Sequence, residues 1–144
     1  MQFSAAGMEL LKRSEGFRAR IYLDHNGYPT IGYGHKMQQA DSWPHGIDES
    51  MAEHILSCDV ADAATEIEHL VKVPLTQGQF DALVDFVFNL GAGRLEHSTL
   101  LGLLNLGQYD EAGQQILRWD HVGGVDSAAL KTRREAELAL WNGV

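Results

Sequence analysis

The 144-residue chain has a single cysteine and no apolar run near the ~20 residues that a membrane-spanning helix needs. One cysteine, Cys58, excludes an internal disulfide, so the fold depends on non-covalent packing. We expect Cys58 to be a small core residue, because only His54 in the neighbouring sequence hints at cysteine chemistry. Residues 1–7 lack the basic patch and apolar stretch of a signal peptide. A function outside the cytoplasm would therefore require another agent to release the protein.

Positive charge is also scarce, with 11 Lys and Arg against 20 Asp and Glu, a net charge of −9 and a pI near 5.1. This balance argues against a nucleic-acid-binding protein, which usually carries a basic stripe. It also disfavours non-specific attraction to anionic membranes or polyanionic wall polymers. The length and the 44% hydrophobic content fit one soluble domain over residues 1–144, and no feature indicates an obligate oligomer, so we expect a monomer.

Glu15 falls at the end of a predicted helix over residues 4–15. Met8, Leu11 and Glu15 are spaced i, i+3, i+7 and share one face, and Gly16 is a natural stop. Burial disfavours the charged form of a carboxyl group, which is what a general acid at neutral pH requires. The alternative is a glutamate that only caps the edge of a helix.

A β-hairpin is predicted over residues 18–35. The β-favouring segments 21–23 and 30–33 are separated by Asp24-His25-Asn26-Gly27, a strong turn signal. If residues 29–34 are extended, Thr30, Gly32 and Gly34 lie on one face. Such a face leaves room for another chain or a ligand to approach closely.

From residue 48 onward the sequence is helical almost throughout. Asp48 is expected to cap a helix that runs to about Leu70, and its inward face is expected to carry Met51, Ile55, Cys58 and Ala61. Thr76 is expected to cap a helix that is apolar on nearly all sides and therefore central and buried, ending at Gly91-Ala92-Gly93. Shorter helices are expected at about 97–105, 109–119 and 127–142.

These elements predict an α+β fold with two lobes. A small mixed lobe (residues 13–50) would lie beside a larger helical lobe formed by residues 1–12 and 51–144. The cleft between two lobes is a natural ligand site.

Glu15, Asp24 and Thr30 are three polar residues set within sixteen positions around this hairpin. Cleavage of a glycosidic bond needs one carboxylic acid to protonate the leaving oxygen and a second group to activate water. A segment that folds back on itself can supply both groups.

Other site classes fail on the sequence. A calcium loop counted from Asp24 would need Gly at position six and Glu at position twelve, where Pro29 and His35 stand. The seven histidines show no HExxH or paired i, i+4 spacing for zinc. The segment Gly32-Tyr33-Gly34 lacks the other residues of a phosphate loop, and no G-x-S-x-G elbow is present. We expect no metal and no cofactor.

One segment resembles a known family. The stretches Glu15-Gly16, Tyr22-Leu23-Asp24 and Gly27-Tyr28-Pro29-Thr30-Ile31-Gly32-Tyr33-Gly34-His35 resemble the bacteriophage T4-type lysozymes, the phage endolysin muramidases of glycoside hydrolase family 24. The Glu–Asp spacing of nine and the Asp–Thr spacing of six match the catalytic triad of that family. The resemblance continues through residues 80–91, 98–101, 109–112 and 130–135, and so covers nearly the whole chain.

The resemblance implies a lysozyme-like fold and hydrolysis of the β-1,4 bond between N-acetylmuramic acid and N-acetylglucosamine in peptidoglycan. Glu15 would be the general acid, Asp24 the base or electrostatic partner, and Thr30 would help to hold the attacking water. The family is described as inverting, which requires a gap of roughly 6.5–9.5 Å between the carboxyl groups.

The resemblance also implies roles for residues around the triad. Either Arg133 or Arg134 would approach Glu15, and a cation there would oppose the effect of burial on its pKa. His35 would be structural and paired with Asp59. Positions that line the saccharide cleft of the family are matched by Gly34, Phe88, Asn89 and Ser98, although core packing is the alternative for Phe88.

The expected partner is the peptidoglycan glycan strand. By resemblance, the protein would stay in the host cytoplasm until a holin-type pore releases it to the wall, without inserting into a membrane. Many relatives are basic whereas this chain is acidic, which weakens any expectation of activity on intact cells from outside. Two alternatives stay open: a lytic transglycosylase, which uses one acid/base Glu and no water, and a lysozyme-like binding module without turnover.

Overall fold

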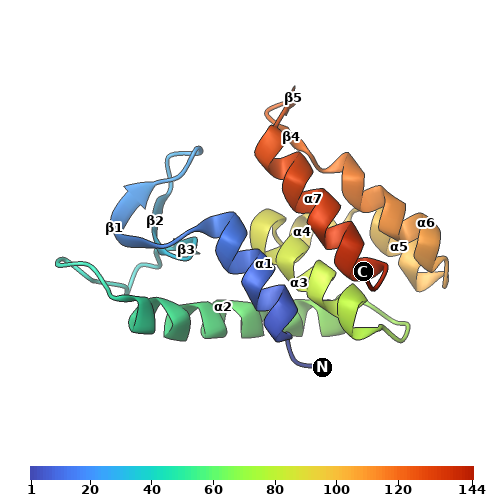
Figure 1. Ribbon diagram of the computed structural model, residues 1–144, viewed down its shortest axis with the longest axis horizontal. Coiled ribbons are helices and arrows are strands. Elements are labelled where there is room, and N and C mark those ends of the chain that lie inside the picture. The colour runs from blue at the N-terminus through green and yellow to red at the C-terminus, as the bar shows by residue number, and fades with distance from the viewer.

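Helices account for most of the chain in the computed structural model, which describes residues 1–144 (Figure 1). The elements in chain order are α1 (Ala5–Glu15), β1 (Arg18–Leu23), β2 (Pro29–Gly32), β3 (His35–Lys36), α2 (Glu49–Leu70), α3 (Gln77–Leu90), α4 (Ala92–Glu96), α5 (Thr99–Asn105), α6 (Tyr109–Gln115), the 3-10 turn η1 (Ile116–Arg118), β4 (His121–Val122), β5 (Val125–Asp126) and α7 (Ala128–Trp141). Strands β1, β2 and β3 form an antiparallel sheet in that order, and β4 and β5 form a separate hairpin. The expected α+β class is confirmed.

Side-chain caps fix where the principal helices begin. The expected caps are present: Asp48 accepts a hydrogen bond from the backbone N–H of Met51 at the start of α2, and Thr76 accepts one from Gln79 at the start of α3. In turn, the side-chain oxygen of Gln79 accepts a hydrogen bond from the backbone N–H of Thr76. The two bonds together form a capping box. These caps satisfy backbone donors that the first helical turn leaves unpaired.

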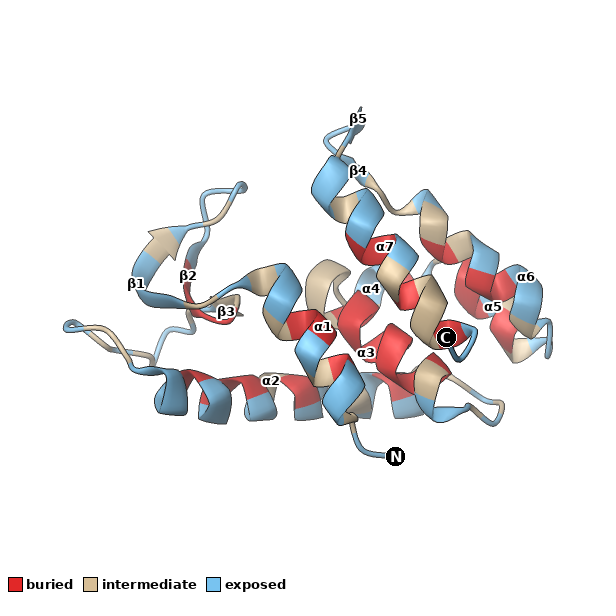
Figure 2. Cartoon of the chain, in the orientation of Figure 1, coloured by how far each residue is buried: buried red, intermediate tan, exposed pale blue.

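Helix α3 is the centre of the core, as its apolar sequence predicts. Its residues from Gln79 to Val87 are all buried, and it packs against α1, α2, α4 and α7. Figure 2 shows the middle of α3 coloured as buried, whereas α2 is buried on one side only. Because α3 touches most other helices, side chains at its C-terminal end are held on a rigid support.

The inward face of α2 differs from the expectation. Ile55 is buried, but Met51 is 42% exposed, and Cys58 and Ala61 are exposed as well. The stripe that packs inward contains Ala52, Ile55, Leu56, Val60, Ala63 and Ile67. The two stripes are offset by one residue, about 100° around the helix. Cys58 is therefore a surface residue, and its expected place in the core is wrong.

The strand predicted over residues 29–34 also differs. β2 ends at Gly32, which has φ +66°, and Gly34 has φ +68° in the turn that follows. Because both glycines take the left-handed region, Thr30, Gly32 and Gly34 do not share a strand face. A side chain on Gly32 would press on Ile47 and on Ala52 of α2. The glycines serve close packing within the chain.

Two elements were not anticipated. α4 starts directly after Gly91, whose φ of +95° ends α3, and the Gly123-Gly124 turn closes the β4–β5 hairpin. None of the helices is long and apolar enough to cross a membrane. In Figure 1 the β1–β3 sheet lies at one end of α2, and the other helices gather around its opposite end.

Candidate functional site

A cleft of about 720 Å³ opens between the β1–β2 hairpin and the helical body. In Figure 1 the β1–β2 and β4–β5 hairpins rise on either side of it. Glu15, Asp24 and Thr30 all line this cleft. The other residues that line it are Arg18, Tyr22, Leu23, His25, Asn26, Gly34, Lys36, Phe88, Asn89, Leu90, Gly91, Arg94, His121, Val122, Gly123 and Leu130.

Glu15 is the last residue of α1, and its side chain is 18% exposed. Its Oε2 accepts a hydrogen bond of 2.6 Å from Nη1 of Arg133. Gly34 lies against the same carboxyl group, since a Cβ at Gly34 would stand 2.7 Å from Glu15 Cδ and closer still to Oε1. The carboxyl group of Glu15 thus lies between the guanidinium of Arg133 and the backbone of Gly34, where a side chain would not fit.

Arg133 is fixed from behind by Asp85. Its Nε and Nη2 donate to the two carboxylate oxygens of Asp85, each at 2.9 Å, so the pair is bidentate and buried. Burial alone would lower the pKa of Arg133, but Asp85 and Glu15 outweigh it and the pKa is raised. Of the two arginines expected near Glu15, Arg133 makes the contact, whereas Arg134 donates to Asn89 and Glu137.

Asp24 is a fixed anion at the hairpin turn. One oxygen accepts from Lys36 Nζ at 2.9 Å, and the other accepts from the backbone N–H groups of Asn26 and Tyr28, both at 2.9 Å. The Lys36 hydrogen bond, helped by the Tyr28 bond, lowers the pKa of Asp24 to about 2. A carboxylate with so low a pKa is a weak base, so the electrostatic role fits this geometry better than strong proton abstraction.

Thr30 is buried at 2% exposure on β2, opposite Tyr22 of β1. Its hydroxyl donates to the carbonyl oxygen of Tyr28 at 2.9 Å. With its proton committed to that bond, the hydroxyl oxygen keeps lone pairs that can accept a hydrogen bond from water.

His35 is held between two carboxylates. Nδ1 lies 2.7 Å from Asp59, which is the partner that the resemblance implied, and Nε2 lies 2.8 Å from Asp41. The Asp59 hydrogen bond, with a further contribution from Asp41, raises the pKa of His35 to about 9. The cationic ring ties the β3 region to α2. Asp41 was not expected, because the loop that carries it has no pattern in the sequence.

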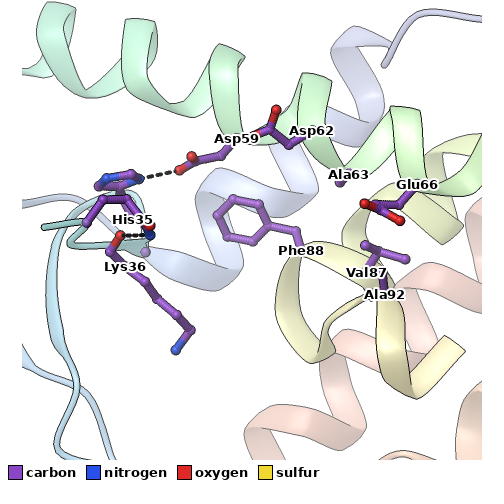
Figure 3. Close-up of a pocket in the computed structure, with 11 residues that line it drawn as sticks. His35, Lys36, Asp59, Asp62, Ala63, Glu66, Val87, Phe88 and Ala92 are labelled. Carbon is purple, nitrogen blue, oxygen red and sulfur yellow. Dashed lines mark hydrogen bonds and ion pairs between the residues drawn. The ribbon is translucent and has the colours of Figure 1, made fainter. Parts of the chain in front are cut away.

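A smaller pocket of about 270 Å³ adjoins the cleft and shares Gly34, Lys36 and Phe88 with it. Figure 3 shows the ring of Phe88 projecting into this pocket, and a dashed line marks the contact between His35 and Asp59. Phe88 is only partly buried and packs against the core cluster, so it has both a core contact and a face on the cleft.

Two other expected contact residues are already engaged within the chain. Asn89 lines the cleft, and its Oδ1 accepts from Arg134 at 2.8 Å. Ser98 caps α5, where it accepts from the backbone N–H of Leu101 and donates to the carbonyl oxygen of Leu95. Ser98 does not line the cleft.

Sequence reasoning missed Lys36, Asp85 and Glu137. Asp85 could have been identified from the sequence, because it lies on a helix that is apolar on nearly all sides. A carboxylate buried in such a helix needs a buried partner. Lys36 on β3 pairs with Asp24 at the β1–β2 turn, a contact that depends on the register of the three-stranded sheet. No group of three or more His, Cys, Asp or Glu residues is arranged to hold a metal ion.

Known proteins share this chain's sequence and fold. The family model for phage lysozyme matches residues 12–137. The endolysin of Bacillus phage B103 is 42% identical over 144 residues, covering 98% of this chain and 54% of that relative, so the chain spans about half its length. The endolysin of Salmonella phage P22 is 39% identical and is covered over 98% of both chains.

A solved structure agrees with these sequence matches. The endolysin of the Escherichia coli O157:H7 phage FAHEc1 superposes with a TM-score of 0.88 at 32% identity, over 100% of this chain and 96% of the other.

Proposed function

Because the chain belongs to the phage lysozyme family, we propose that it is an endolysin that hydrolyses peptidoglycan during host lysis. The bond cleaved is the β-1,4 link between N-acetylmuramic acid and N-acetylglucosamine. The observation that carries this proposal is the single cleft that contains Glu15, Asp24 and Thr30.

Glu15 is the proposed proton donor. It stands at the cleft wall, mostly shielded from solvent, where a protonated carboxyl group can reach the leaving glycosidic oxygen. Arg133 holds the carboxyl group in place through a hydrogen bond of 2.6 Å.

Asp24 and Thr30 are the proposed groups on the water side. Asp24 stays ionised because Lys36 and two backbone N–H groups stabilise its charge. This anion can stabilise the oxocarbenium-like transition state and orient water, and the hydroxyl oxygen of Thr30 can accept a hydrogen bond from the same water. An inverting reaction follows if a water molecule fits between the sugar and these two groups.

The remaining proposed roles concern the glycan. Gly34, Phe88 and Asn89 line the cleft and are the proposed sugar contacts, whereas Arg133 supports Glu15 from behind. Ser98 caps α5 and is not among the proposed sugar contacts.

Lysis of outer-membrane-permeabilised Gram-negative cells tests the assignment. Glu15→Gln should abolish clearing while the circular dichroism spectrum and melting temperature stay close to those of the parent. Asp24→Asn should be severely impaired. Clearing by Glu15→Gln at near the parent rate would show that another group supplies the proton.

Mass spectrometry of the released muropeptides separates hydrolysis from the main alternative. Hydrolysis leaves reducing N-acetylmuramic acid ends, whereas a lytic transglycosylase leaves 1,6-anhydro ends. Abundant anhydro ends would overturn the hydrolase proposal, and tight glycan binding without any product would favour a binding module.

The release route stays a prediction: the protein waits in the cytoplasm and reaches the wall through a holin-type pore. Expression in Escherichia coli with and without a co-expressed holin tests it. Lysis at the same time in both cultures would contradict holin dependence.

A further inference from the structure

A cluster of buried charges is connected to Glu15 through Arg133. Asp85 on α3 and Arg134 and Glu137 on α7 are all fully buried, and Arg133 is nearly so. Asp85 and Arg133 are already paired with each other. No step of the proposed hydrolysis uses Glu137. Burial of a charged glutamate has a large free-energy cost unless the carboxylate is paired or neutral.

Glu137 has one oxygen satisfied and one without a partner. Its Oε1 accepts from Nη2 of Arg134 at 2.7 Å, but Oε2 is buried and receives no hydrogen bond from any donor. The carboxylate of Asp85 lies close enough to Glu137 for each group to shift the pKa of the other. Two neighbouring buried carboxyl groups cannot both be ionised at low cost, and a proton on Glu137 would give the unpaired oxygen a hydrogen to donate.

The contacts of Asp85 decide which group carries that proton. Both Asp85 oxygens accept hydrogen bonds from Arg133 in a bidentate pair, which requires the ionised form. Burial would raise the pKa of Asp85, but Arg133 outweighs burial and the pKa is lowered. Burial raises the pKa of Glu137 well above its ordinary value, and the neighbouring Asp85 adds to this against the pull of Arg134.

The burial of the cluster supports the same assignment. Asp85 is already paired with Arg133, and an ionised Glu137 would add a second negative charge beside Asp85 in a region that water does not reach. The other polar groups facing the cluster are the side-chain oxygen of Asn89 and the carbonyl oxygen of Trp119, and both accept from Arg134.

We propose that Glu137 is a positioning residue for the proton donor: a neutral carboxylic acid that donates a hydrogen bond to Asp85 and so fixes Arg133 against Glu15. The acid acts through two other residues and does not touch the sugar. Its effect on turnover rests on the proposed hydrolase function, whereas its protonation state does not.

Carbon-13 NMR of the parent protein tests the protonation state directly. The carboxyl carbon of Glu137 should show the chemical shift of a protonated acid at pH 7. Glu135 is an exposed glutamate on the same helix and should show the shift of an ionised carboxylate. A Glu137 signal at the ionised position would overturn the proposal, whatever the enzyme assays show.

Two variants test the positioning role. Glu137→Gln keeps a neutral side chain with a donor, so kcat and the alkaline limb of the pH profile should stay as in the parent. Glu137→Met removes the donor, so kcat should fall by about tenfold with KM unchanged, because Arg133 loses its fixed orientation. Glu135→Gln, which also removes a carboxylate from α7, is the control and should change nothing.

The outcomes distinguish this proposal from the proposed function. If Glu137 is ionised, Glu137→Gln deletes a buried negative charge and moves the alkaline limb of the kcat profile to lower pH. That result would overturn the proposal. If the parent protein cleaves no peptidoglycan, the proposed function fails, and the NMR measurement still decides the state of Glu137.

Discussion

Replacing Gly34 by alanine probes how closely the backbone approaches the proposed proton donor. The new Cβ would stand 2.7 Å from Glu15 Cδ, whereas ordinary contact begins at 3.4 Å, so the carboxyl carbon must move by about 0.7 Å. Such a move would disturb the 2.6 Å hydrogen bond between Glu15 and Arg133. Because misplacing a reacting group by about 1 Å costs about 100-fold in rate, kcat should fall by roughly 10- to 100-fold.

Gly107 provides a matched control. Its φ is +78°, close to the +68° of Gly34, but a Cβ there would meet no atom within 4 Å. Alanine in the left-handed region costs about 1–2 kcal/mol at either position, so both variants should lose a similar backbone contribution to stability. Only Gly34→Ala places an atom against the carboxyl group of Glu15.

The assay is initial-rate release of soluble muropeptides, with unfolding in urea measured on the same samples. Gly107→Ala should retain the parent kcat, and Gly34→Ala should lose it while remaining folded at the assay temperature. Equal kcat values for the two alanine variants would refute the reasoning, because the contact between residue 34 and Glu15 would then have no effect on turnover.

Three further perturbations test charge and packing. Lys36→Met removes the main cause of the low pKa of Asp24, so that pKa should rise from about 2 toward its ordinary value. The acidic limb of the pH profile of kcat should then move to higher pH. An acidic limb that does not move would argue against Asp24 as the required anion. The pKa of His35 is raised from 6.5 to about 9, so the stabilisation from its ion pairs is complete below pH 6.5 and is lost as the pH rises through 9. The melting temperature should therefore fall between pH 6.5 and 9 in a thermal scan. Asp41→Asn should shift this fall, and the His35 transition in an NMR titration, to lower pH. Phe86→Ala deletes a fully buried ring at the centre of α3 and should lower the free energy of unfolding by about 3–5 kcal/mol in a urea titration; a loss below 1 kcal/mol would contradict the central place of α3.

Local signals predicted much of the fold. Asp48 and Thr76 cap helices where the sequence places them, since capping depends on neighbours within three residues. The hairpin turn at Asp24 formed for the same reason. These features need no knowledge of distant contacts.

Other features depend on tertiary contacts that the sequence does not specify. Two stripes one residue apart on α2 both include Ile55, and the packing of α3 and β2 against the helix selects the one without Cys58. Arg133 and Arg134 are adjacent in sequence but point about 100° apart, so the rotation of α7 decides which one meets Glu15. The buried partnership of Asp85 and Glu137 joins positions 52 residues apart, beyond the reach of any local pattern.

The contact between Glu15 and Arg133 spans 118 residues. A ribosome therefore finishes the hairpin well before it reaches the arginine whose guanidinium contacts Glu15. A polypeptide interrupted before residue 128 would contain all three residues of the proposed triad and still lack α7. The order of synthesis thus delays assembly of the proposed catalytic centre until α7 has been translated.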